Sequence, residues 1–72
     1  MCFYRNLSGR SNVKAFLINT CSIDVLFYGT NRIYRYSYSR AGKFHVDNMK
    51  ALALRGFGLN SYINRNCKYL YD

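Results

Sequence analysis

The stretch Arg32–Ser39 constrains this chain more than any other, because tyrosine occupies every second position in its middle. Successive side chains of a β-strand point to opposite faces, so Tyr34, Tyr36 and Tyr38 line one face of a predicted strand. Aromatic residues also favour pleated, half-buried surfaces. The tyrosine face is either part of the core or a platform on which bases stack. We favour the core, because helices must cover one face and this face is the more apolar one.

Two further strands are predicted ahead of the tyrosines. Val13–Ile18 is an apolar run, and Ile23–Tyr28 places Ile23, Val25 and Phe27 on one side. Gly29, Thr30 and Asn31 tolerate the positive φ that a hairpin loop of this length requires. The three strands predict an antiparallel meander, which is about the minimum for a stable sheet. Cys2, Phe3 and Tyr4 either add a frayed edge strand or pack over one end of the core.

Helical spacing after the sheet predicts two short helices. Asp47 or Asn48 caps the first, which runs through Leu54 and ends before Gly56. Asn60 or Ser61 caps the second. The residues expected to face the core are Met49, Leu52 and Ala53 in the first helix and Leu59, Tyr62, Ile63, Cys67 and Leu70 in the second. The predicted fold class is therefore α+β, a three-stranded antiparallel β-meander followed by two short helices packed on one face.

Length and charge limit the functions to consider. The 72 residues predict a single domain, residues 1–72, and an apolar content of 50% argues against disorder. Eleven lysines and arginines against three aspartates give a formal charge of +8. Such a charge attracts polyanions, so nucleic acid, an acidic protein surface, an anionic nucleotide and anionic lipid all fit it.

Three segments carry a resemblance to a known family. Ser11–Ala15 opens the domain, Tyr34-Arg35-Tyr36 is a Y-x-Y at its centre, and Gly56–Ile63 starts the last helix. This arrangement, over residues 11–66, resembles the KTSC domain, which occurs at the C-terminus of some lysyl-tRNA synthetases and as a stand-alone protein of bacteria and phages. The chain departs from the family pattern in a longer hairpin before the tyrosines and in Leu54-Arg55 before Gly56. The resemblance implies the fold and an RNA-binding role.

Basic residues interleaved with tyrosines predict where an anion binds. Lys14, Arg35, Arg65 and Lys68 would neutralise phosphates across a basic open face of the sheet, and an exposed tyrosine would stack on a base. Arg65 and Lys68 are neighbours three residues apart on the last helix. The candidate residues for nucleic-acid or anion binding are Lys14, Arg32, Arg35, Tyr36, Arg65 and Lys68.

The sequence gives little support for a catalytic site or a metal site. His45 and the three aspartates fall on separate predicted elements, whereas acid–base catalysis needs paired titratable groups. The three cysteines, Cys2, Cys21 and Cys67, contain no closely spaced pair to nucleate a zinc site. Their odd number also favours reduced thiols over a disulfide framework. We expect a protein without enzymatic activity, metal or cofactor.

The sequence therefore predicts a small basic binding module for RNA or another single strand. The alternatives are a phage accessory protein that binds and inhibits an acidic host protein, and a homo-oligomer that sequesters an anionic nucleotide. No apolar run is long enough for a signal peptide or a membrane span, so no membrane partner is expected. The expected location is the cytoplasm, and the host cytoplasm if the chain is encoded by a phage.

Overall fold

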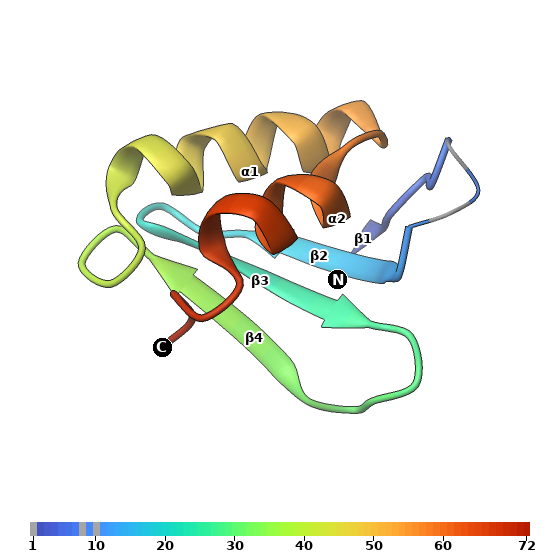
Figure 1. The fold of residues 1–72 in the computed structure, drawn as a ribbon, viewed down its shortest axis with the longest axis horizontal. Coiled ribbons are helices and arrows are strands. Elements are labelled where there is room, and N and C mark those ends of the chain that lie inside the picture. Colours follow the sequence, from blue (N-terminus) through green and yellow to red (C-terminus); the bar gives the residue numbers. More distant parts are fainter. Residues whose placement is uncertain (1, 8, 10) are drawn as a thin grey trace.

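Four antiparallel strands form one sheet, and two helices cover one of its faces (Figure 1). This computed structural model describes residues 2–7, 9 and 11–72. The strands lie in chain order: β1 (Cys2–Phe3), β2 (Val13–Ile18), β3 (Ser22–Phe27) and β4 (Ile33–Ser37). The predicted α+β class and the meander are confirmed. The predicted strand number is wrong, because Cys2 and Phe3 pair with Phe16 and Ala15 of β2.

Alternation along the strands separates a covered face from an open face. Val25 lies between Phe16 and Tyr34, Ile23 lies between Ile18 and Tyr36, and this side packs on the helices. The side chains one position along point the other way. This second side, which we call the open face, carries Phe3, Ala15, Leu17, Asp24, Leu26, Ile33 and Arg35.

The tyrosine face of β4 belongs to the core. Tyr36 is 1% exposed, and Tyr34 and Tyr38 are partly buried against the same cluster. The prediction that the tyrosine face is part of the core is therefore confirmed. Burial raises the pKa of Tyr36 to about 12, with smaller contributions from Cys67, Tyr34 and Tyr71. A ring at this depth cannot stack on a base in the folded protein, so Tyr36 is not available for direct contact with a base.

Helix α1 (Lys43–Arg55) begins earlier than the sequence predicts. Gly42, with φ of 95°, occupies the capping position, and no side chain caps the helix start. The predicted cap at Asp47 or Asn48 is wrong, because both residues lie inside the helix. The Asp47 carboxylate accepts bonds from the Tyr38 hydroxyl and from Lys43 Nζ, both at 2.6 Å. Met49 and Ala53 are buried and Leu52 is partly buried, as expected.

The last helical segment consists of α2 (Leu59–Tyr62) and a π-helical turn, η1 (Ile63–Cys67). It begins at Leu59 after Gly58, so the predicted cap at Asn60 or Ser61 is wrong. Gly58, with φ of 86°, takes a conformation that asparagine and serine adopt at a higher cost. The predicted core stripe is confirmed, since Leu59, Ile63 and Cys67 are buried and Tyr62 and Leu70 are partly buried.

Gly56 ends α1 and supports the N-terminal segment. Its φ is 78°, its amide donates to the Leu52 carbonyl at 3.0 Å, and its carbonyl accepts from the Leu7 amide at 2.8 Å. A Cβ added here would lie 2.7 Å from Cβ of Arg5. The Cβ atom of Arg5 is bonded to the backbone and cannot move aside as the end of a long side chain could. The two segments therefore pack closely only because residue 56 is glycine.

We expect Gly56→Ala to destabilise the fold by about 3 kcal/mol, because positive φ costs about 1–2 kcal/mol and overpacking adds about 1–3 kcal/mol. Gly29→Ala is the matched control, since Gly29 has φ of 82° but nothing within 4 Å of an added Cβ. That variant should lose about 1 kcal/mol. Urea unfolding of both variants measures the difference, and equal losses would contradict the close packing at Gly56.

The raised pKa of Tyr36 predicts a loss of stability at alkaline pH. Above its ordinary value of 10.0, Tyr36 loses its proton in the unfolded chain while the folded chain retains it to about pH 12. The stabilisation present below pH 10 is therefore lost as pH rises to about 12, an effect of about 2–3 kcal/mol. Tyr36→Phe should lose less stability than the parent protein between about pH 9 and 11.5 in urea unfolding. Parallel curves for the two proteins would refute this role of Tyr36.

Candidate functional site

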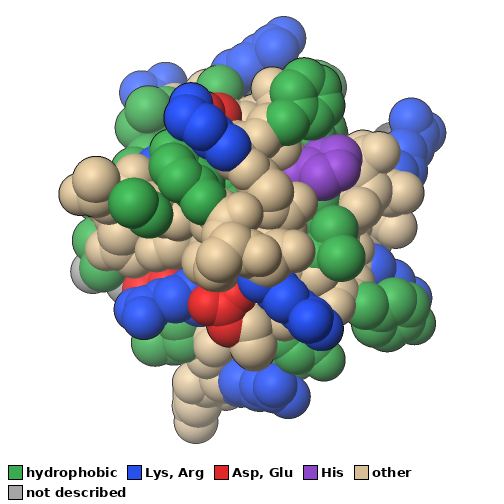
Figure 2. Space-filling model, turned by 90° about the vertical axis from the view of Figure 1, so that its left-hand side faces the viewer, with side chains coloured by type: hydrophobic (Ala, Val, Ile, Leu, Met, Phe, Trp, Pro, Cys, Tyr) green, Lys and Arg blue, Asp and Glu red, His purple; other side chains and the backbone are tan. Residues whose placement is uncertain are grey.

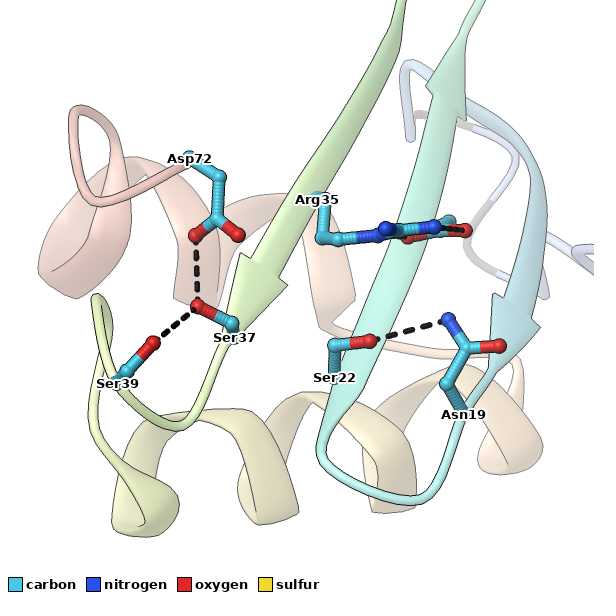
Figure 3. Close-up of polar contacts among 7 residues, drawn as sticks. Asn19, Ser22, Arg35, Ser37, Ser39 and Asp72 are labelled. Atoms are coloured by element: carbon cyan, nitrogen blue, oxygen red, sulfur yellow. Dashed lines mark hydrogen bonds and ion pairs between the residues drawn. The ribbon is translucent and has the colours of Figure 1, made fainter.

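The open face holds one of the predicted phosphate-binding residues, Arg35, in an ion pair. Arg35 Nε donates to Asp24 Oδ1 at 2.7 Å, and Nη2 donates to Oδ2 at 3.1 Å. Figure 3 shows the guanidinium reaching across β3 from β4. The hydrogen bond from Arg35 lowers the pKa of Asp24, against the opposing effect of burial. The charge of Arg35 is thus already balanced.

The rest of the open face is largely apolar. Phe3 is 78% exposed, Ile33 is 53% exposed and Leu17 is 41% exposed. At the β4 edge, Ser37 Oγ donates to Asp72 Oδ1 at 2.7 Å and lies 3.2 Å from Ser39 Oγ (Figure 3). The predicted basic open face is therefore wrong, because an ion pair and apolar side chains occupy the sheet there. On the end of the molecule in Figure 2, basic side chains stand apart from one another instead of forming a continuous patch.

A groove lined by aromatic residues lies on the helix side of the sheet, between the β3–β4 hairpin and the C-terminal segment. Its volume is about 330 Å³. Two of its tyrosines remain accessible, since Tyr28 is 52% exposed and Tyr69 is 72% exposed. We call it the aromatic groove, and its lining is Asn12, Phe27, Tyr28, Thr30, Tyr34, Tyr36, Ile63, Asn64, Lys68, Tyr69 and Tyr71.

Edge-to-face contacts hold the inner rings of the aromatic groove. Tyr34 meets Phe27 at a centroid distance of 5.4 Å and Tyr71 at 4.9 Å. The Arg32 guanidinium lies 4.9 Å from the Tyr34 ring centre and 5.2 Å from that of Tyr71. Such aromatic pairs and stacked cations each contribute about 0.5–1.5 kcal/mol. The inner wall of the aromatic groove is therefore preformed.

The C-terminal residues are fastened along β4, which brings the last tyrosines to the groove. The Asp72 amide donates to the Arg35 carbonyl at 2.7 Å, and the Leu70 amide donates to the Cys67 carbonyl at 3.0 Å. Tyr71 thereby reaches Tyr34 and Tyr36 from the far end of the chain. Lys68 lies 5.5 Å from the centre of the Tyr69 ring and lines the same groove.

The structure gathers three of the six predicted residues around the β3–β4 hairpin. Lys68 lines the aromatic groove, Arg32 stacks on two rings of its wall, and Lys14 lines an adjoining hollow that shares Phe27, Tyr28 and Thr30. The remaining three are buried or lie away from the hairpin. Tyr36 contributes buried floor, Arg35 lies on the open face, and Arg65 is exposed on η1 but does not line the groove.

Sequence reasoning missed the two most accessible rings of the aromatic groove, Tyr28 and Tyr69. Tyr28 stood at the end of a predicted strand, and Tyr69 fell outside the helical core stripe. The position of Tyr69 outside the core stripe could have indicated its exposure, because an aromatic side chain outside the core pattern is left at the surface. Asn12 and Asn64 were missed as well, and their amides supply donors and acceptors at the groove.

The cations around the groove take no part in the salt bridges of the described residues. The salt bridges between described residues are Asp24–Arg35 and Lys43–Asp47, and neither involves Lys14, Arg32 or Lys68. The carboxylate of Asp72 accepts a bond from Ser37. An anion at the hairpin therefore meets positive side chains that these ion pairs do not neutralise.

The groups considered for catalysis lie apart or serve structural roles. His45 Nδ1 lies 2.8 Å from the Tyr62 hydroxyl, which also accepts from Asn48 at 3.1 Å. Among the described residues, no three of the metal-binding types gather in one place. Cys2 and Cys21 are exposed free thiols, while burial raises the pKa of the free thiol of Cys67.

None of the helices in the described part of the chain has the length and apolar character needed to cross a membrane. Comparison with protein-family models, with curated proteins and with solved structures finds no match to this chain. The geometry of the groove and of the open face therefore carries the functional argument.

We expect Arg35→Gln to destabilise the fold, because Asp24 is left buried without its bidentate partner. The lowered pKa of Asp24 means that its contribution is present above the ordinary value of 3.8 and is lost as pH falls through the folded-state pKa. Arg35→Gln should therefore lose less additional stability than the parent between neutral pH and about pH 2. Arg40→Gln, on the exposed β4–α1 turn, is the control for charge. An effect no larger than that of the control would refute a structural role for the pair.

Proposed function

We propose that this protein binds single-stranded nucleic acid, with bases stacked on Tyr28 and Tyr69 in the aromatic groove. The observation that carries the proposal is the pairing of two exposed tyrosines with a preformed groove of about 330 Å³. Small-molecule sites begin at about 300 Å³, so the groove is large enough for a base.

The lining suits a base and its phosphate. Every base has a flat π-face, and stacking on an aromatic side chain contributes about 1–3 kcal/mol. The side chains of Asn12, Thr30 and Asn64 supply hydrogen-bonding groups for the edge of a base. Lys68 and Arg32 stand beside the rings, where phosphates attached to a stacked base would pass.

The resemblance to the KTSC domain supports RNA as the first ligand to test. The Y-x-Y of that resemblance, Tyr34-Arg35-Tyr36, supplies the groove wall and floor through its tyrosines, while Arg35 turns to the open face. In this proposal the motif builds the site, and residues outside it make contact with the strand.

A protein partner is the second candidate, because the open face, which no helix of the described residues covers, leaves Phe3, Leu17 and Ile33 accessible. Apolar side chains at the centre of a patch are typical of interfaces, whereas phosphates need cations there. The proposed host-inhibitor role would use this surface. The third candidate, capture of an anionic nucleotide, would use the aromatic groove.

We expect Tyr28→Ala and Tyr69→Ala each to weaken binding about tenfold, the loss that corresponds to one stack of about 1.4 kcal/mol. Phe44→Ala is the matched control, since Phe44 is an exposed aromatic residue in the first turn of α1 and does not line the groove. Fluorescence anisotropy with labelled oligouridylate and oligoadenylate, as RNA and as DNA, measures the affinities.

Binding should also weaken with added salt, because Lys and Arg that neutralise phosphates release counterions. If both tyrosine variants bind as Phe44→Ala does, the groove is not the site. If the parent protein binds none of the oligonucleotides at low salt, the proposed function is wrong.

A further inference from the structure

A second hollow continues the aromatic groove past Tyr28. It has a volume of about 280 Å³ and is lined by Lys14, Phe27, Tyr28, Gly29, Thr30 and Asn31. Phe27, Tyr28 and Thr30 line both spaces, so the two adjoin along these side chains. We call the second space the hairpin hollow. Tyr28, which is 52% exposed, thus borders both spaces.

The two spaces have different chemistry. The aromatic groove offers ring surfaces, whereas the hairpin hollow is formed by the hairpin loop and by Lys14, and only Phe27 and Tyr28 bring rings to it. Lys14 lines this hollow at a register irregularity of β2, where Val13 lies opposite Phe27 and Ala15 lies opposite Leu26. A bulge re-aims a side chain that regular alternation would point to the other face. A cation and polar loop groups favour a phosphate more than a second base.

We infer that the ligand is a strand of two or more nucleotides that crosses Tyr28, with one phosphate near Lys14 and the next near Lys68. This inference rests on the proposed function and adds to it the path of the strand and the places of two phosphates. A mononucleotide would fill the aromatic groove and leave Lys14 without a phosphate. Arg32, stacked on Tyr34 and Tyr71, adds positive charge on the Lys68 side.

The test measures affinity against ligand length and against the charge at residue 14. Oligouridylates of one, two, four and eight nucleotides, each with a 5′-phosphate, are titrated by calorimetry or by competition anisotropy. Affinity should rise at least tenfold from one to four nucleotides, since the second phosphate and the second stack engage only in the longer ligands. Lys14→Gln should weaken binding of the tetranucleotide about three- to tenfold and reduce the salt slope by about 0.7, the value for one phosphate on a single strand.

Two controls make the outcome specific. Lys14→Gln should lower mononucleotide affinity no more than Arg40→Gln does, whereas Lys68→Gln should weaken ligands of every length. Arg40→Gln removes the same charge from the turn at the other end of β4, and it should lower affinity less than Lys14→Gln does. Equal affinities for one and four nucleotides, or equal effects of Lys14→Gln and Arg40→Gln, would overturn the inference. In either case, octanucleotide binding that still needs Tyr28 and Tyr69 would preserve the proposed function. If no oligonucleotide of any length binds, both the proposed function and this inference are wrong.

Discussion

The packing of Tyr36 against the helices fixes where each surface of this protein lies. A chain of this size has enough apolar area for one core layer, so only one face of its sheet can be covered. Tyr36 is in that layer with Ile23, Val25 and Met49. Because alternate residues point to opposite faces, the position of Tyr36 sends Arg35 to the open face, where Asp24 meets it.

The same alternation explains why the groove is aromatic. Tyr34 is two residues before Tyr36 and lies on the covered face, toward the hairpin end of β4. There it packs with Phe27 of β3 and with Tyr71 of the C-terminal segment. Core packing and the candidate site are thus continuous, and the floor of the groove is the outer layer of the core. A ligand would meet rings whose positions the fold has already fixed, which reduces the entropy lost on binding.

The elements that the sequence predicted correctly are those with a clear period. The tyrosine alternation located β4 and its buried face, and the spacing of Leu59, Ile63 and Cys67 located the last core stripe. Helix starts were mispredicted because Asp47 resembles a cap, while a glycine with positive φ begins each helix. The site was harder to predict, because the groove joins residues near 28 and 34 to residues near 64 and 71. Lys14 was identified, but the register irregularity of β2 at this residue has no sign in the sequence.

The two accessible surfaces differ in charge, and this difference separates the candidate functions physically. On the open face the charges of Asp24 and Arg35 cancel between exposed apolar side chains. At the hairpin, Lys14, Arg32 and Lys68 surround rings and are free of both salt bridges of the described residues. Contacts driven by apolar burial change little with moderate salt, whereas phosphate contacts weaken steeply. Because the surfaces lie on opposite sides of the sheet, a protein bound to the open face would leave the groove accessible to a strand.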